Sequence, residues 1–232
     1  MISAYAWWSV MHNYSLAIVP AQILFYLLAV ATLVVFFRQP GESANRVIKG
    51  FFVLAFGWIG VVLFLLLGQE LPAHNVQAVL FLSLAALFTL DLLTNTSQFS
   101  MPQAGWRRSA TIIGFGLVMA AYPLVGIVQG RPASKWLIPG TFPCPTTALA
   151  LIFMTTAWPS KHRWLYFVSL GLLLIWAIPF PLMIQIPKFG VYEDGIMVMT
   201  GLYSIVMLAI NWPRPGGVEI APHSRAPNSS RP

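Results

Sequence analysis

The sequence predicts an all-α protein, a polytopic bundle of about seven transmembrane helices. Of the 232 residues, 58% are hydrophobic and 8% are charged, whereas a soluble domain carries about 25% charged residues. So few charges cannot cover a surface that faces water. The apolar residues also gather into runs, most of them close to the roughly 20 residues that a helix needs to cross a bilayer.

The first four apolar runs reach spanning length, and polar or turn-forming residues bound each of them. The first ends at the Arg-Gln-Pro-Gly sequence of residues 38–41, and the second ends at Gln-Glu-Leu-Pro, residues 69–72. The third gives way to the polar residues 94–98, and the fourth follows Arg107 and Arg108. Charged and turn residues of this kind end helices. The expected spans are residues 15–37, 50–68, 76–93 and 110–128.

The fifth run, residues 146–158, is too short to cross a bilayer by itself. About 13 residues make roughly 20 Å of helix, against a hydrocarbon core of about 30 Å. The preceding stretch 137–145 is apolar but contains Pro139, Pro143 and Pro145, so we expect it to be irregular. Irregular backbone at membrane depth is tolerated only where protein or a water-filled cavity surrounds it.

Two further spans and two terminal segments complete the predicted organisation. The sixth span, 164–186, contains Pro179, and a kink is expected there because proline removes a backbone donor and clashes with the preceding turn. The seventh span is 196–212. Aromatic residues mark 1–14 as a segment at the membrane interface, and proline among polar residues marks 213–232 as a disordered cytoplasmic tail. The transmembrane domain is then 15–212.

Basic residues in alternate loops predict the orientation of the bundle. Cytoplasmic loops of membrane proteins carry an excess of Lys and Arg. An outside N-terminus and an inside C-terminus place ten basic residues inside and three outside. The inner ones are Arg38, Arg46, Lys49, Arg107, Arg108, Lys161, Arg163, Arg214, Arg225 and Arg231, and the outer ones are Arg131, Lys135 and Lys188. The net charge of +7 therefore indicates orientation in a lipid bilayer, and no nucleic-acid partner is expected.

The most unusual string in the chain is Pro143-Cys144-Pro145-Thr146-Thr147, directly before the short fifth helix. Thr146 or Thr147 could cap that helix, and a helix N-terminus favours a thiolate that reacts or binds a soft metal. The alternative is that the prolines shape the turn and Cys144 is a small buried residue. As the single cysteine, Cys144 can form neither an intramolecular disulfide nor a multi-thiolate metal site.

Charged residues near the ends of spans have structural and functional interpretations. Asp91 lies near the inner end of the third span, where Arg107 or Arg108 could pair with it. Glu193 and Asp194 precede the last span, where they could neutralise Lys188 or favour the start of the helix. A cation contact at these two carboxyl groups is the less favoured interpretation.

Uncharged polar residues and isolated histidines are the other candidates. Gln22 and Gln185 lie in or near spans and are expected to hydrogen-bond between helices. His12 and His74 are isolated on the outer side. They fit ordinary interfacial residues better than metal or haem ligands, and no cofactor is identified.

Four motifs carry a resemblance to a known family. They are residues 14–22, Tyr122-Pro123 with Gly126 and Gly130, residues 142–147, and residues 191–195. Together they resemble the multi-pass bacterial membrane family called domain of unknown function 6064. The resemblance implies a bacterial inner-membrane protein with these motifs in its outer half, and it implies no activity. Arg131 stands where the family has a histidine, so no role of that histidine carries over.

The predicted topology brings these motifs to the outer ends of spans one, four, five and seven. We therefore expect an outward-facing pocket whose wall includes the irregular fifth segment and the Pro179 kink. The candidate pocket residues are Tyr14, Gln22, Tyr122, Pro143, Cys144, Pro145, Thr146, Thr147, Glu193 and Asp194.

Three functions remain open at this stage. Interrupted helices favour a carrier or permease for a small, mostly neutral or hydrophobic solute. The absence of an extramembrane domain suits an accessory or structural subunit with a membrane-protein partner, or a homo-oligomer. A membrane enzyme or cofactor-binding protein using Cys144 or the outer histidines is the third, although no base, nucleophile and orienting group stand out together.

Overall fold

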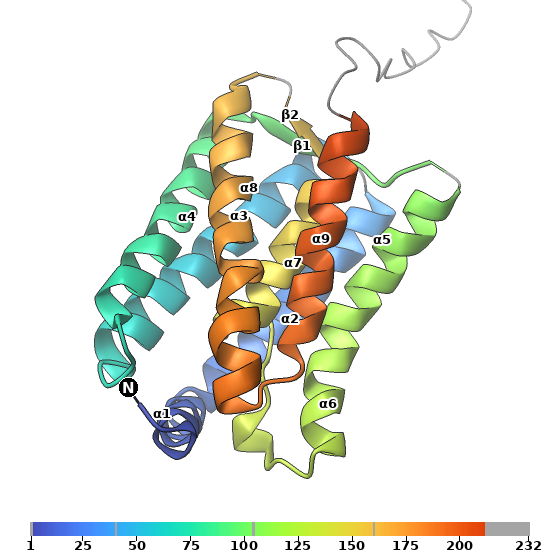
Figure 1. Ribbon diagram of the computed structural model, residues 1–232. Helices are drawn as coiled ribbons and strands as arrows, with labels where there is room; N and C mark the ends of the chain where they lie inside the picture. Colours follow the sequence, from blue (N-terminus) through green and yellow to red (C-terminus); the bar gives the residue numbers. More distant parts are fainter. Residues whose placement is uncertain (1, 40, 104, 160, 212–232) are drawn as a thin grey trace, which may run out of the picture.

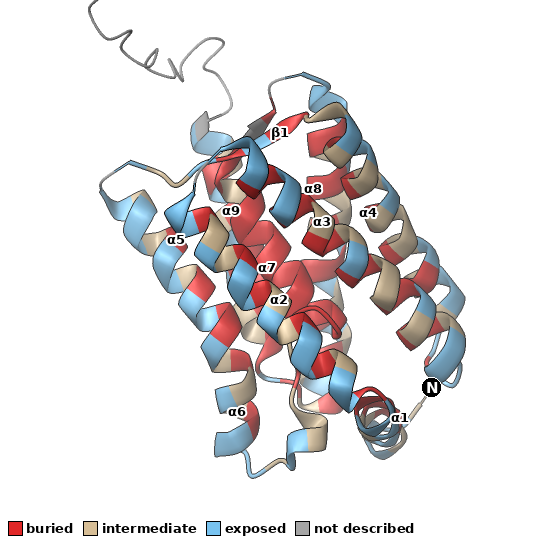
Figure 2. Cartoon of the chain, turned by 180° about the vertical axis from the view of Figure 1, so that it is seen from behind, coloured by how far each residue is buried: buried red, intermediate tan, exposed pale blue. Residues whose placement is uncertain are grey.

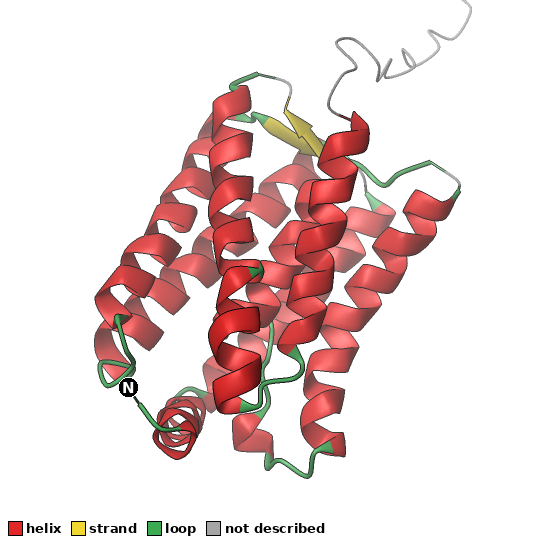
Figure 3. Cartoon of the chain, viewed as in Figure 1, coloured by secondary structure: helices red, strands yellow, loops and turns green. Residues whose placement is uncertain are grey.

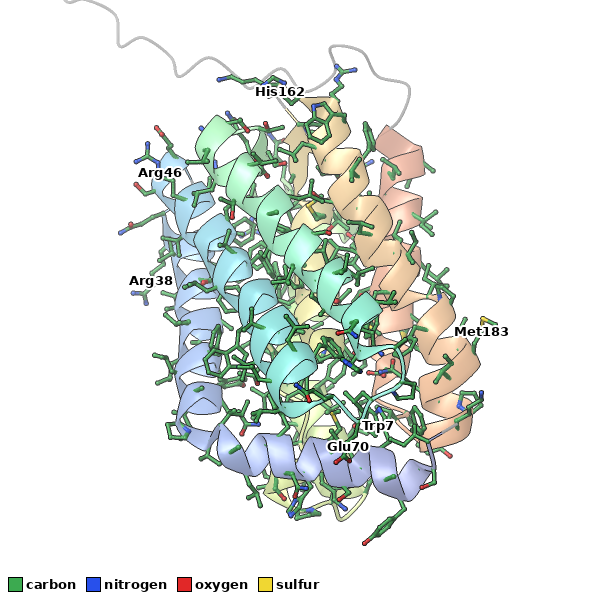
Figure 4. The ribbon with its side chains drawn as sticks, turned by 90° about the vertical axis from the view of Figure 1, so that its left-hand side faces the viewer. Trp7, Arg38, Arg46, Glu70, His162 and Met183 are labelled. Carbon is green, nitrogen blue, oxygen red and sulfur yellow. The ribbon has the colours of Figure 1, made fainter. Side chains whose placement is uncertain are left out.

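Helices run side by side along the molecule, and one helix, α1, lies across their end (Figures 1 and 4). The computed structural model describes residues 2–39, 41–103, 105–159 and 161–211. The α-helices are α1 (Ala4–Ala17), α2 (Val19–Arg38), α3 (Glu42–Trp58), α4 (His74–Thr94), α5 (Trp106–Gly116), α6 (Tyr122–Val128), α7 (Pro143–Thr155), α8 (Arg163–Ala177) and α9 (Asp194–Asn211). The described chain also has π-helical segments η1 (Ile59–Leu67), η2 (Leu117–Ala121) and η4 (Pro181–Phe189), a 3-10 turn η3 (Ala133–Lys135), and strands β1 (Ser97–Phe99) and β2 (Ala157–Pro159).

Five of the described helices are long and apolar enough to cross a membrane, and in three of them α and π segments join end to end. The five are Val19–Arg38, Glu42–Leu67, His74–Thr94, Trp106–Val128 and Arg163–Phe189. Their flanks expose large apolar side chains, such as Ile23 and Leu27 on α2 and Val79 on α4. Apolar surface on this scale is typical of a membrane-facing protein. The all-α class is confirmed, and the chain is an integral membrane protein.

The short helix α7 occupies the centre of the bundle. Every residue from Pro143 to Met154 is buried, and the helix is red along its length in Figure 2. Thirteen residues are enough because other helices, and not lipid, surround α7 on all sides. The backbone around its start is satisfied by protein, as irregular structure at membrane depth requires.

Phe153 joins α7 to its neighbours through aromatic packing. Its ring centroid lies 4.8 Å from that of Phe115, 5.3 Å from Phe36, 5.7 Å from Phe52 and 5.9 Å from Phe99. Such pairs contribute about 0.5–1.5 kcal/mol each beyond the burial of apolar area. The five rings, which we call the phenylalanine cluster, come from α2, α3, β1, α5 and α7, and they fill this part of the interior.

The boundaries of the first and fifth helices differ from those expected. The N-terminal helix continues to Ala17, and the first span begins at Val19 because Pro20 suits the first turn of a new helix. The fifth helix begins at Pro143 and not at Thr146. Pro143 occupies the first turn, where its missing N–H leaves no bond unmade, so the expected irregular stretch is shorter. Residues 213–232, the expected tail, lie outside the described residues.

Thr146 does not cap α7 as expected. The first residue before the helix is Phe142, and no side chain caps it. The Thr146 hydroxyl donates to the Phe142 carbonyl at 2.6 Å and accepts from the Gly140 N–H at 2.7 Å. Gly140 has φ +97°, and a Cβ there would lie 2.8 Å from Phe25 Cβ. Thr146 therefore stabilises a glycine turn that leads into the helix.

The sixth helix is irregular near Pro179, as expected. Regular α-helix ends at Ala177, Ile178 departs from helical geometry with φ −107° and ψ −64°, and π-helix follows from Pro181. Proline removes the backbone donor that a regular helix would use here. The chain nevertheless continues as one long apolar helix, Arg163–Phe189.

The end of the bundle away from α1 is closed by a buried ion pair and a small sheet. Lys49 Nζ lies 3.0 Å from Asp91 Oδ1, and both side chains are buried. The expected pairing of Asp91 with Arg107 or Arg108 is therefore wrong, because Lys49 faces inward from α3 onto α4. Asp91 Oδ1 also accepts from the Ser97 N–H at 2.8 Å, which positions β1 for antiparallel pairing with β2 (Figure 3).

Replacing Lys49 with Met should lower the free energy of unfolding by about 3–5 kcal/mol, because Asp91 would be left buried without its cation. Arg46→Ala is the matched control, since Arg46 and its partner Glu42 are exposed on the same helix and such pairs contribute at most about 1 kcal/mol. Denaturant titration in detergent would compare the two variants. Equal losses would contradict a buried, tightly coupled pair.

Candidate functional site

A pocket of about 420 Å³ lies at the end of the bundle that α1 crosses. Leu63 and Phe64 of η1 and Leu80 of α4 form part of its wall, and Ile184 of η4 and Met11 of α1 form another. Pockets that bind small molecules have volumes of about 300–1,000 Å³ and mainly apolar walls. The size and the lining both suit a small apolar ligand.

The remaining wall comes from the start of α7 and from polar residues. Phe142, Pro143 and Cys144 line it at the start of α7. Gln185 and Lys188 line it from η4. Lys188 is exposed and is the charged residue among the described lining residues. The wall therefore offers mainly apolar contact, with few polar groups that could orient a ligand.

Two of the π-helical segments in the described chain, η1 and η4, contribute to this wall. π-helical turns are rare and occur frequently at functional sites. Their wider turns change which side chains of a helix face inward. No pattern in the sequence predicts them, so the expected pocket included no residue of η1.

All ten candidate pocket residues are buried. Two of these ten described residues, Pro143 and Cys144, line the pocket. The others lie behind the wall or in neighbouring elements. They are Tyr14, Gln22, Tyr122, Pro145, Thr146, Thr147, Glu193 and Asp194. Most of the candidates therefore lie outside the pocket lining.

Tyr14 holds the irregular stretch before α7 in place. Its hydroxyl donates to the Thr141 carbonyl at 2.8 Å and accepts from Trp58 Nε1 at 3.0 Å. The ring also packs edge-on against Phe142, with centroids 5.4 Å apart. Gln22 acts locally, because its Nε2 donates to Ser15 Oγ at 2.8 Å. Tyr14 therefore connects α1 to the pocket wall, whereas Gln22 joins α2 to α1.

Three candidates from distant parts of the chain meet in one polar network. Gln185 Nε2 donates to Cys144 Sγ at 3.0 Å, and the Asp194 carboxyl is close enough to Cys144 to interact with it electrostatically. The Tyr122 hydroxyl lies 3.4 Å from Asp194 Oδ1. We call Tyr122, Cys144, Gln185 and Asp194 the thiol network. It lies directly behind the pocket, and Cys144 and Gln185 belong to both.

Glu193 forms a buried ion pair with Arg131, and not the expected pair with Lys188. Arg131 also donates to the Gly190 carbonyl at 2.9 Å and lies 4.2 Å from the ring centroid of Trp8. Burial raises the pKa of the Glu193 carboxyl above its ordinary range, although the guanidinium of Arg131 opposes that shift. Arg131 thus ties α1, the turn after η4 and the start of α9 together.

His12 and His74 form hydrogen bonds outside the thiol network. His12 Nδ1 is 2.7 Å from Ser134 Oγ, and His74 Nδ1 is 3.3 Å from the Leu71 carbonyl. In the described ranges, no group of three His, Cys, Asp or Glu residues could hold a metal ion. Neither Cys144 nor the histidines therefore contribute to a ligand set of that size.

The fold and the pocket define an integral membrane helical bundle with a small-molecule-sized apolar pocket at one end. The chain belongs to the family of unknown function DUF6064, which it matches over residues 4–214. The family resemblance of the four sequence motifs is thereby confirmed. No curated protein and no solved structure matches the chain.

Replacing Arg131 with Gln should destabilise the protein more at about pH 8 than at about pH 5. A carboxyl group whose pKa is raised by folding contributes stability at low pH and loses it as the pH rises through that pKa. Without the guanidinium, the pKa of Glu193 rises further, and the charged carboxylate is left buried without the Arg131 cation. Melting temperatures across pH would show this, and Arg131→Gln combined with Glu193→Gln should lose the pH dependence. An equal loss at both pH values in the single variant would contradict the prediction.

Proposed function

We propose that the protein is a carrier, or permease, for a small and mostly apolar solute that it holds in the 420 Å³ pocket. Seven spans, with the shorter α7 and α9 added to the five long helices, would form the carrier. The ten inner and three outer basic residues support an outside N-terminus. That orientation makes the pocket outward-facing, in a bacterial inner membrane.

The pocket is the observation that carries this proposal. Its wall is mainly apolar, so a charged solute would lose its hydration there without an adequate replacement. Val76 and Ile175 are lining residues whose side chains are also exposed on the flanks of α4 and α8. A solute dissolved in the membrane could therefore reach the pocket sideways, between these helices.

The bundle is closed at the end opposite the pocket, as one state of an alternating-access cycle requires. The phenylalanine cluster and the Lys49–Asp91 pair fill the bundle there. Next to the pocket, Ile178 and η4 interrupt a regular helix, and short irregular segments are where helices hinge in conformational change. Movement of η4 against η1 would open and close the pocket without unpacking α7.

A tryptophan at Ile184 should fill the pocket and abolish stabilisation by apolar solutes. Ile184 lines the pocket, whereas Met183 in the same segment is 69% exposed and points away from the bundle (Figure 4). Met183→Trp is therefore the matched control. Melting temperatures of purified protein, measured with a panel of small neutral apolar molecules, test binding because a ligand of the folded state raises its stability.

Uptake of a stabilising solute into liposomes then tests transport. Ile184→Trp should reduce the uptake rate to that of protein-free liposomes, and Met183→Trp should not. Binding without uptake would contradict the carrier and leave a binding protein or an accessory subunit. The absence of any solute-dependent stabilisation in the unmodified protein would contradict the pocket as a binding site.

A further inference from the structure

The pocket wall contains a buried hydrogen-bond acceptor that has no partner in the described chain. Gln185 is 2% exposed, and its Oε1 makes no hydrogen bond to the described residues. Its backbone carbonyl, by contrast, accepts from the Val191 N–H at 3.2 Å. A buried acceptor left unpaired destabilises the fold, because it has lost its hydrogen bonds to water. A buried polar atom without a partner therefore requires an explanation.

The Cys144 sulfur accepts from one end of the Gln185 amide. Of the two ends of the amide, only the NH₂ group donates. Nε2 is accordingly held at 3.0 Å from Cys144 Sγ, and the oxygen is the end without a partner.

Two other glutamine side chains differ from Gln185 in burial or in position. Gln77 also lines the pocket, but it is only partly buried and its Nε2 donates to the Pro72 carbonyl at 2.7 Å. Gln22 is 6% exposed, outside the pocket, and its oxygen is not among the unpartnered buried atoms. Gln185 combines burial, a place in the pocket wall and an unused acceptor.

We propose that the solute is an apolar molecule that carries one hydrogen-bond donor, such as an alcohol or a phenol, and that this donor binds Gln185 Oε1. The apolar body then lies against Leu63, Phe64 and Ile184. The inference rests on the proposed function, because it names the class of ligand for the same pocket. A hydrocarbon or an ether should bind less tightly than a matched alcohol or phenol, since neither can donate to an amide oxygen.

A pair of probes that differ in one donor tests this inference. para-Hexylphenol and para-hexylanisole share the ring and chain, but only the phenol has a hydroxyl hydrogen. Their affinities are measured by titration of the full-length protein in nanodiscs, each corrected for its partition into protein-free nanodiscs. The phenol should bind about five- to tenfold more tightly.

Gln185→Met keeps the length of the side chain and removes the amide. In this variant the phenol should lose its advantage, so the affinity ratio falls to about one. Gln22→Met is the matched control, because it replaces another buried glutamine outside the pocket and should leave the ratio as it was. The anisole affinity of each variant shows whether the pocket is still formed.

The outcomes separate the two proposals. Equal binding of both probes to the unmodified protein would overturn the donor-bearing ligand and would support an apolar pocket. A phenol preference that survives Gln185→Met, or that disappears with Gln22→Met, would also overturn the role of Gln185. Failure of both probes to bind the unmodified protein would instead count against the pocket itself.

Discussion

The burial of α7 on every side is the constraint on which the rest of the structure depends. A helix of 13 residues is too short to face lipid across a bilayer of about 30 Å. It is stable here because neighbouring helices surround it and Phe153 packs against four other rings. Since α7 fills the centre along part of the bundle only, the space beyond its first turn is available for a pocket.

Buried charges at the two ends of the bundle are paired in ways that give the ends different roles. At one end, Lys49 and Asp91 join α3 to α4 and position the small sheet. At the other, Arg131 and Glu193 join the loops around α1 and α9. Removing one residue of such a pair destabilises the fold, because the other charge is left buried without a partner. Between the second pair and α7 lies the thiol network, which connects these supports to the pocket wall.

Much of the fold could be predicted from hydropathy, whereas partners and exact helix starts could not. The seven apolar runs correspond to helices, including the short fifth one. Loop position favours Arg107 or Arg108 as the partner of Asp91. In the folded protein, however, Lys49 of α3 faces inward and pairs with Asp91. Thr146 has the chemistry of a helix cap, but Pro143 begins the helix three positions earlier, and Thr146 binds the turn instead. Local patterns limit the choices of partner without selecting one.

The sequence by itself determined the membrane class, the helical segments, the family and the end of the bundle at which unusual residues gather, because these follow from composition, length and motifs along the chain. Only the tertiary structure decided that eight of the ten candidate residues lie outside the pocket lining and that η1, α4 and η4 contribute to it. The physical reason is that a pocket is space left between elements after packing. Which side chains face that space depends on helix rotation and on π-helical turns, neither of which leaves a local signal in the sequence.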